Sequence, residues 1–326
     1  MQRGAILRAV VGIAISVVAV ALVLGTVDVS KTADALSRAD LRWVLLGAAL
    51  STGDLAFRGL RWQRLIQPIA PVRFLPMFGY LLVGYAANNI LPARLGELVR
   101  SHYLGDREGL SRAAALGTVV IERVVDLVAV VAIASVALLV LSVRGVLVSA
   151  VFIGAAVAGL LLAAVAIGIV AHRLPGVDRI AAYVERWPQV RELGRSLQGG
   201  LGVVSRPRTL VETLLATAAA WTCSLLAVAA LGQALGVQLS IGQAALMTSG
   251  VALAAAIPAA PSNIGTFEAA AVATGTTIGL PAATALAIGL LSHGVILVIT
   301  SIGGLIAFLR IGWAPTTGAD EAKSAP

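Results

Sequence analysis

The feature that most constrains this chain is a series of apolar runs, each long enough to cross a lipid bilayer as a helix. A spanning helix needs about 17–25 predominantly apolar residues. Such runs occur at residues 6–27, 41–57, 116–143, 146–171, 210–235 and 282–309. Charged residues make up 12% of the chain, against roughly 25% in soluble domains. The sequence therefore predicts an all-α polytopic membrane protein with a single integral membrane domain over residues 1–313.

Two further apolar stretches, 74–91 and 242–280, are interrupted by proline and glycine close to a carboxylate. Proline breaks a helix because it lacks the backbone N–H and its ring clashes with the preceding turn. We expect each stretch to form the two half-helices of a re-entrant hairpin. This gives about six spanning helices and two hairpins, with eight full spans as the alternative.

Arginines gather between the apolar runs, and their distribution predicts the orientation of the chain. Four follow the second run: Arg58, Arg61, Arg64 and Arg73. Seven more lie between the fourth and fifth runs: Arg173, Arg179, Arg186, Arg191, Arg195, Arg206 and Arg208. The positive-inside rule places both groups in the cytoplasm. With a cytoplasmic N-terminus, this requires each broken stretch to enter and leave on the same side, which favours hairpins over full spans.

The same arrangement predicts an inverted repeat in the cytoplasmic (inner) membrane, with halves at about 1–143 and 146–313. Secondary transporters use inverted halves with broken helices to build a site near the bilayer midplane. We expect residues 172–208 to form an amphipathic cytoplasmic loop or a solvated connector, and 314–326 a disordered cytoplasmic tail. The net charge of +8 comes largely from short loops, so it does not indicate a nucleic-acid partner.

Both broken stretches contain proline, a short gap, glycine and then glutamate. The first reads NNILPARLGELVRSHYL over residues 88–104, and the second reads PAAPSNIGTFEAA from residue 258. The matching residues are Pro92, Gly96 and Glu97 in the first, and Pro261, Gly265 and Glu268 in the second. We expect the prolines and glycines to shape the breaks, with an anion attracted to each half-helix N-terminus. Candidate caps and binding residues beside them are Asn88, Asn89, Ser262 and Asn263.

A third motif, ERVVD at residues 122–126, places three charges inside the run 116–143. Glu122 and Asp126 are four residues apart and share one helix face, and Arg123 lies between them. A charge at the centre of a membrane helix costs about 2.5–3.5 kcal/mol even on the lenient insertion scale. The motif therefore has to face other helices, other charges or water rather than lipid.

The charged residues of these motifs also have structural alternatives. Arg123 can neutralise Glu122, Asp126 or Glu97 in a buried cluster that fixes helix packing. Glu97 and Glu268 can act as local caps of their half-helices.

Other polar side chains are open to two interpretations as well. Arg94 and Arg100 can bind a phosphate or extend to the lipid headgroups. His293 can bond a neighbouring helix or carry a proton. Asp54 and Arg58, four residues apart, are expected to form an interfacial pair.

The sequence contains no signature of a soluble enzyme, such as GxxxxGK(S/T), HExxH or a serine elbow. Its single cysteine, Cys223, excludes an internal disulfide and a cysteine metal cluster. The longest non-membrane segment, 172–208, is too short to fold around a core of its own. We therefore expect neither a metal nor a cofactor.

The motifs resemble the flippase-like membrane module of bacterial lysylphosphatidylglycerol synthases, a family that includes relatives of archaeal dolichyl-phosphate hexose transferases. The resemblance is carried by Asn88 and Asn89 with LPARLGE (91–97) and Arg100, by ERVVD, and by PSNIGTFE (261–268). It implies a module that moves an amino-acylated or otherwise modified phospholipid across the cytoplasmic membrane, with the hairpins at the lipid path. Because the soluble aminoacyl-transferase domain is not among these residues, we expect no synthesis of lysylphosphatidylglycerol by this chain alone.

The leading hypothesis is a flippase or transporter for a phospholipid or polyprenyl lipid, rather than an enzyme. Its expected phosphate-binding residues are Arg94, Arg100 and Arg123, and those for a basic headgroup are Glu97, Glu122, Asp126 and Glu268. The alternative is a membrane-embedded glycosyl or aminoacyl transferase in which Glu122 or Asp126 is the general base. A third interpretation is an accessory subunit of a separate transferase.

Overall fold

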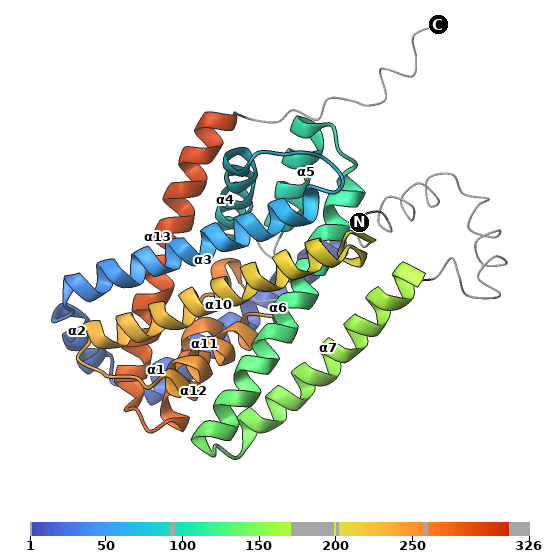
Figure 1. Ribbon diagram of the computed structural model, residues 1–326. Coiled ribbons are helices and arrows are strands. Elements are labelled where there is room, and N and C mark those ends of the chain that lie inside the picture. The colour runs from blue at the N-terminus through green and yellow to red at the C-terminus, as the bar shows by residue number, and fades with distance from the viewer. Residues whose placement is uncertain (1, 92–94, 171–198, 200–201, 257–259, 313–326) are drawn as a thin grey trace, which may run out of the picture.

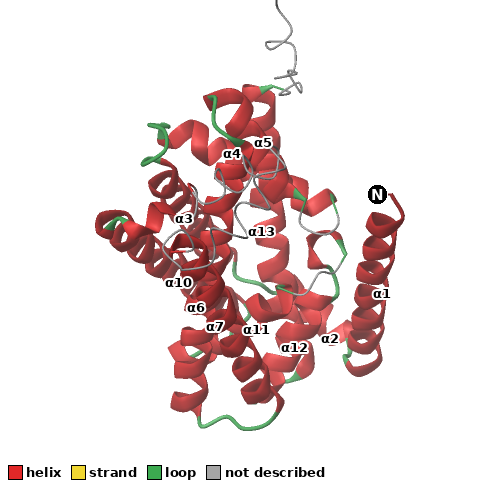
Figure 2. Ribbon diagram, turned by 90° about the vertical axis from the view of Figure 1, so that its right-hand side faces the viewer, coloured by secondary structure: helices red, strands yellow, loops and turns green. Residues whose placement is uncertain are grey.

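The computed structural model describes the chain apart from residues 1, 92–94, 171–198, 200–201, 257–259 and 313–326. All regular structure in this described part is helical, which confirms the predicted all-α class (Figures 1 and 2). The α-helices are α1 (Gln2–Thr26), α2 (Val29–Ser37), α3 (Leu41–Ile66), α4 (Phe74–Ile90), α5 (Gly96–Glu108), α6 (Arg112–Leu141), α7 (Val146–Val170), α10 (Pro207–Ala234), α11 (Ile241–Ala255), α12 (Thr266–Thr277) and α13 (Ala282–Ile311). Two short 3₁₀ turns are η3 (Gly202–Ser205) and η4 (Pro261–Asn263). Pro92, Arg94, most of the predicted loop 172–208 and the predicted tail lie outside the described residues.

Four helices are long and apolar enough to cross a membrane: α6, α10, α13 and residues Leu147–Ala166 of α7. They coincide with four of the six predicted spans. In the described part of α1, residues Ile13–Thr26 reach the same criterion only together with α2, from which they are bent by 88°. The described residues thus contain four candidate spans, or five if the bent pair counts as one. The remaining predicted span, 41–57, forms part of the longer and more charged α3.

The stretch between the predicted spans 6–27 and 41–57 contains the helix α2. Asp28 caps it, because one of its carboxylate oxygens accepts hydrogen bonds from the backbone N–H groups of Ser30 and Lys31, at 3.1 and 3.2 Å. Asp40 likewise caps α3 through the backbone N–H of Arg42, at 2.9 Å. Carboxylates at these N-caps satisfy free donors, which explains why α2 and α3 start where they do.

α3 and α10 lie side by side over most of their length (Figure 1). The helices approach closely at Gly47, where an added Cβ would stand 2.6 Å from the side chain of Leu231. α3 continues to Ile66, so Arg58 and Arg61 are inside a helix, and Arg61 is fully buried. Their predicted position in a cytoplasmic loop was wrong, because hydropathy along the chain does not register the partners that other helices supply.

Both proline–glycine motifs coincide with a break between two helices. The expectation that residues 74–91 themselves split into two half-helices was wrong, because residues 74–90 form the single helix α4, in which Pro76 lies in the first turn where proline is tolerated. α4 packs on α5 at Gly84 and Gly96, where a methyl group added to Gly96 would overlap the carbonyl oxygen of Gly84. α11 packs on α12 at Gly250 and Thr274. α13 contacts α4 on one side and α12 on the other, and η4 contacts α4. The two breaks are therefore brought together beside α13.

α1 and α7 lie at the periphery of the fold (Figures 1 and 2). α1 packs on α12, and α7 packs mainly on α6. Both expose large apolar side chains, such as Leu22 at 63% and Leu160 at 72%. Exposed apolar surface of this extent fits contact with lipid rather than with water.

Candidate functional site

A polar pocket lies between the two helix breaks, with a cavity volume of about 200 Å³. Its lining includes six of the residues predicted from the sequence: Asn88, Asn89, Glu97, Arg123, Ser262 and Asn263. Tyr85, Phe267, His293 and Thr300 also line it. Side chains from the two breaks and from α6 and α13 therefore share one pocket, although they are distant in the sequence.

The first break is held by its two asparagines. The side-chain oxygen of Asn88 accepts a hydrogen bond from the backbone N–H of Gly96 at 2.8 Å, which satisfies a free donor at the start of α5. The amide nitrogen of Asn89 donates to the hydroxyls of Thr300 and Ser301 on α13, both at 2.9 Å. Asn88, rather than Glu97, is therefore the residue that caps the first half-helix.

The two breaks also touch each other directly. The hydroxyl of Ser262 donates a hydrogen bond to the backbone carbonyl of Asn89 at 3.1 Å. Ser262 and Asn263 both have φ of 59°, and Gly265 has φ of 86°. Positive φ is strained for serine and favourable for glycine, so the contacts around this turn must hold it in its strained conformation.

Glu97 and Arg123 form an ion pair on the lining of the polar pocket. Arg123 Nε lies 3.2 Å from Glu97 Oε1, and the two side chains are 34% and 23% exposed. Of the three carboxylates that the sequence offered to Arg123, the structure selects Glu97. The pair is the most exposed charge in the pocket, so it is positioned to meet a polar ligand.

Glu268 has the capping role that the sequence suggested, and a second one. Its Oε2 accepts a hydrogen bond from the backbone N–H of Gly265 at 2.6 Å, and its Oε1 lies 2.6 Å from Nδ1 of His293. Nε2 of His293 lies 2.9 Å from the backbone carbonyl of Ser262. The ring of Phe267 stacks on that of His293, with centroids 4.3 Å apart. Glu268 and His293 together hold the second break to α13.

Behind the polar pocket, six charged side chains form a continuous chain of ion pairs that we call the ionic network. Its members are Asp54, Arg58, Arg61, Arg100, Glu122 and Asp126. Arg61 donates to both oxygens of Asp126, at 2.6 and 2.9 Å, and to Glu122 at 3.1 Å. Trp221 and Thr217 of α10 add hydrogen bonds, at 3.3 Å to Asp126 and at 3.2 Å to Arg61.

Arg100 and Arg58 complete the network. Arg100 donates to Glu122 at 2.7 Å and lies over the ring of Trp62. The predicted pair of Arg58 and Asp54 forms, at 2.9 Å, but it is buried within the network rather than interfacial. Arg58 also reaches Asp126 at 3.3 Å. Arg100 is 3% exposed, so it does not extend to the headgroups as one alternative supposed. Three arginines balance three carboxylates, and a neutral network of this kind suits a low-dielectric interior.

The network separates the predicted site residues into two groups. Arg100, Glu122 and Asp126 bind one another and do not line the polar pocket. Glu268 lies behind His293, outside the lining. The structure therefore places Glu97 and Arg123 at the pocket and assigns the other charges of the motifs to packing or support.

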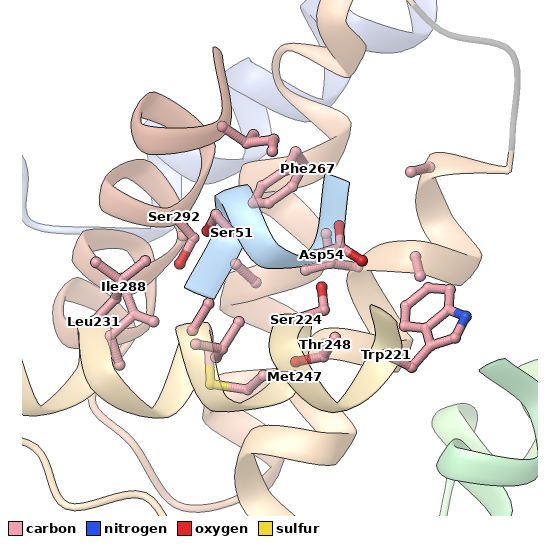
Figure 3. Close-up of a pocket in the computed structure, with 18 of the residues that line it drawn as sticks. Ser51, Asp54, Trp221, Ser224, Leu231, Met247, Thr248, Phe267, Ile288 and Ser292 are labelled. Carbon is pink, nitrogen blue, oxygen red and sulfur yellow. The ribbon is translucent and has the colours of Figure 1, made fainter. Parts of the chain in front are cut away.

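A second pocket of about 200 Å³ adjoins the first, with Phe267 in the lining of both. Asp54 and Arg58 of the ionic network line it, together with Trp221 and many apolar residues of α10, α11 and α13. Figure 3 shows Phe267, Asp54 and Trp221 around this space. Phe267, whose ring stacks on that of His293, thus lies between the two pockets.

A larger, apolar cavity of about 770 Å³ lies among α4, α5 and α13. Its lining includes Ala87, Val99, Leu305 and Phe308, and Leu91 lines both this cavity and the polar pocket. Leu98 and Leu305 are 51% and 57% exposed, so the cavity faces the outside of the fold. A polar space and an apolar space therefore meet at the first break.

Sequence reasoning missed several residues of this region. Arg61 was assigned to a loop, and His293 was considered only by itself. Tyr85 and Thr300 gave no signal, because single hydroxyls in apolar helices are common. The informative signal was the presence of charged residues inside an apolar run. It identified the charged face of α6 but not the residues of α3 that pair with it. Among the described residues, no group of three His, Cys, Asp or Glu side chains is arranged to hold a metal ion.

Comparison with known proteins gives a match over nearly the whole chain. The sequence profile of the lysylphosphatidylglycerol synthase TM region matches residues 9–304. A UPF0104 membrane protein of Methanothermobacter thermautotrophicus is 35% identical over 128 residues, which are 38% of this chain and 36% of that protein. The UPF0104 membrane protein MJ1595 of Methanocaldococcus jannaschii is 26% identical over 129 residues, 39% of this chain and 38% of that protein.

A third relative carries the name of an enzyme. The glycosyltransferase AglD of Haloferax volcanii is 27% identical over 139 residues, which are 42% of this chain and 22% of AglD. The matches thus cover well under half of each relative. No solved structure gives a significant match. Because the family profile matches residues 9–304 and the helices meet the criterion for membrane spans, the chain is a membrane protein that belongs to the lysylphosphatidylglycerol synthase TM-region family.

Proposed function

We propose that this protein moves a polar-headed lipid across the cytoplasmic membrane. The observation that carries the proposal is the shared border of two unlike spaces, since Leu91 lines both the polar pocket and the apolar cavity. A phospholipid or polyprenyl phosphate has the same division into a polar head and a long apolar chain. The head would enter the polar pocket while the chain stays in the apolar cavity or in the bilayer.

The polar pocket has the groups that a modified phosphate headgroup needs. Arg123 would bind the phosphate, since guanidinium groups match phosphate oxygens in charge and geometry. Glu97, 3.2 Å from Arg123, would bind an amine or a hydroxyl of the same headgroup. The amides and hydroxyls of Asn88, Asn89 and Ser262 suit a glycerol, aminoacyl or sugar moiety.

The proposed topology follows from the same spaces. The units α4–α5 and α11–α12 would be re-entrant hairpins that enter from opposite sides, in two inverted halves with both termini in the cytoplasm. Such hairpins expose backbone groups only where these line a polar cavity, as membrane proteins require. Ion pairs behind the pocket would keep the helices together while the breaks move.

Reconstitution tests the proposal directly. Vesicles of phosphatidylethanolamine and phosphatidylglycerol (3:1) would contain a fluorescent phosphatidylglycerol, and a membrane-impermeant quencher would report its movement between leaflets. We expect Arg123→Gln to slow movement at least tenfold. The matched control is Arg208→Gln, because Arg208 is exposed and outside the pockets. Movement by Arg123→Gln at the control rate would overturn the proposal, and mass spectrometry of lipids retained by the purified protein would identify the headgroup.

The similarity to AglD favours one alternative, a transferase that uses a lipid-linked donor. Glu122 and Asp126 were the sequence candidates for its general base. Each of these two carboxylates is held by two arginines and lies outside the lining of the polar pocket, so neither faces the space that a substrate would enter. Glu97 is the carboxylate placed to serve. The test is whether the purified protein transfers sugar from a polyprenyl-phosphate sugar. Transfer that is lost in Glu97→Gln would support this alternative. A separate transferase that modifies the lipid remains the partner we propose for a transport module.

A further inference from the structure

His293 is bonded at both ring nitrogens, and one of the two bonds determines where its proton lies. Nε2 lies 2.9 Å from the carbonyl oxygen of Ser262. A carbonyl oxygen can only accept a hydrogen bond, so Nε2 must carry a hydrogen. The neutral ring then has no hydrogen left for Nδ1, which lies 2.6 Å from Oε1 of Glu268.

The contact between Nδ1 and Oε1 therefore needs one additional proton. With the proton on nitrogen, the pair is an imidazolium and a carboxylate. With the proton on oxygen, it is a neutral imidazole and a carboxylic acid. Without it, two lone pairs face each other at 2.6 Å in a largely buried site, where repulsion is weakly screened. A separation of 2.6 Å between these two atoms thus fits a pair that has bound one proton.

We propose that Glu268 and His293 form a proton-binding site that holds the second helix break closed against the first. The proposal rests on the proposed function in one respect, since the proton would be the coupling ion for lipid movement. Loss of the proton to water in the polar pocket, which His293 lines, leaves a neutral imidazole and a carboxylate. The Nδ1–Oε1 bond then breaks, and no other atom changes its covalent bonds.

Three contacts link the Glu268–His293 pair to the hydrogen bond between the two helix breaks. Glu268 caps Gly265, His293 holds the carbonyl of Ser262, and the hydroxyl of Ser262 bonds the backbone of Asn89. Release of the pair therefore removes the hydrogen bond that ties the start of α12, next to the turn 261–265, to His293 of α13. The positive φ of Ser262 and Asn263 adds strain, which favours opening once that tie is lost.

The other charged side chains near the pair are already paired with an opposite charge. From α5 and α6, the pair Glu97–Arg123 lines the same pocket, and Tyr85 lines it from α4. From α3, Asp54 and Arg58 stand beyond Phe267 in the adjoining pocket. α1 contributes Ser16, whose hydroxyl accepts a hydrogen bond from the backbone N–H of Ala260 at 3.1 Å. The Glu268–His293 pair is thus the one candidate among these groups for uptake and release of a single proton.

Glu268→Gln distinguishes the effect of losing the proton from the effect of losing the hydrogen bonds. The amide oxygen of glutamine can accept from Gly265, and its NH₂ can donate to Nδ1 of a neutral His293. The variant therefore keeps every bond of the protonated pair but has no proton to release. Glu212→Gln is the matched control, because Glu212 pairs with Arg208 at the surface of α10.

A spin label at position 264 reports the mobility of the second helix break without any substrate. Ile264 is 52% exposed, and Cys223→Ser removes the natural cysteine. In Cys223→Ser, Ile264→Cys protein reconstituted in the same 3:1 vesicles, we expect the mobile fraction of the label to rise at least threefold between pH 5 and pH 9. Adding Glu212→Gln should leave the rise intact, and adding Glu268→Gln should abolish it. A mobile fraction independent of pH, or an equal rise in both variants, would overturn the proposal.

Selective ¹⁵N labelling of the three histidines gives a second reading. His293→Gln identifies the signals of His293 by their disappearance. We expect Nε2 to stay protonated at every pH, with only the Nδ1 signal titrating. An unprotonated Nε2 would contradict the assignment.

Lipid movement under a pH gradient separates this inference from the proposed function. We expect two pH units across the vesicle membrane to change the initial rate at least threefold in the natural protein and not in Glu268→Gln. Lipid movement that ignores the gradient would overturn proton coupling and leave the transport function standing. The expected label and histidine responses without any lipid movement would support the proton site and overturn the transport function.

Discussion

Arg61 of α3 and Asp126 of α6 form a bidentate salt bridge. Each terminal nitrogen of the guanidinium donates to a different oxygen of the carboxylate, at 2.6 and 2.9 Å. The two residues are 65 positions apart in the sequence. Arg61 is fully buried, and Asp126 is 7% exposed. This contact joins the charged helix α3 to a helix that meets the criterion for a membrane span.

Arg61→Gln is expected to destabilise the protein severely. Removal of one partner from a buried ion pair leaves the other charge uncompensated and costs about 3–5 kcal/mol. The loss would be measured as a change in the free energy of unfolding in detergent micelles, followed by tryptophan fluorescence. Arg64→Gln is the control, because Arg64 is 33% exposed and its contact with Glu212 is 3.8 Å long. We expect its cost to stay below about 1 kcal/mol.

Removal of both partners should be milder than the sum of the single changes. Arg61→Met with Asp126→Leu leaves two arginines and two carboxylates in the ionic network, so its charge stays balanced. We expect a coupling energy of about 1–3 kcal/mol in the double-mutant cycle. Strict additivity would show that the two residues do not act as a pair.

Gly96→Ala should prevent α4 and α5 from packing. The added methyl would overlap the carbonyl oxygen of Gly84 and lie 2.6 Å from Asn88 Oδ1, which caps α5. Since backbone atoms cannot yield as a flexible side chain does, we expect a loss of unfolding free energy of about 1–3 kcal/mol. Gly159→Ala in α7 is the control, with nothing within 4 Å of the new methyl, and it should stabilise by up to about 1 kcal/mol. Equal effects of the two changes would refute the close contact.

Ala87→Phe tests the apolar cavity. The new ring would occupy part of the space of about 770 Å³ without adding charge. We expect lipid movement in vesicles to slow at least fivefold, while thermal unfolding in detergent changes little. Leu160→Phe, at an exposed position of α7, should leave lipid movement unchanged. If both variants moved lipid equally fast, the cavity would not hold the lipid chain.

Local sequence patterns predicted the helical class, four candidate spans and both helix breaks, because proline, glycine and apolar run length act within a few residues. They also placed Asn88, Asn89 and Ser262 at the breaks, where the structure joins them. The extension of α3 through Arg58 and Arg61 could not be predicted in this way. Those charges are tolerated only because α6 supplies carboxylates, and that pairing is set by tertiary packing.

The same limit explains the two-part outcome for the candidate site. Each charge of ERVVD required a partner, and the sequence offered several for each. The structure gives Glu97 to Arg123, and it gives Arg61 and Arg100 to Glu122. His293 was a lone histidine in an apolar run, and only the fold places Glu268 and Ser262 at its two nitrogens.

The separation of Arg61 from Asp126 has a consequence for biogenesis. When α3 leaves the ribosome, Arg58 and Arg61 have only Asp54 beside them, and entry of an unpaired arginine into lipid costs about 2.5–3.5 kcal/mol. Asp126, the main partner of Arg61, is synthesised 65 residues after it, which takes roughly 3–13 s at about 5–20 residues per second. α3 is therefore expected to wait beside the insertion machinery until α6 emerges, and the two helices to enter the bilayer as a neutral pair.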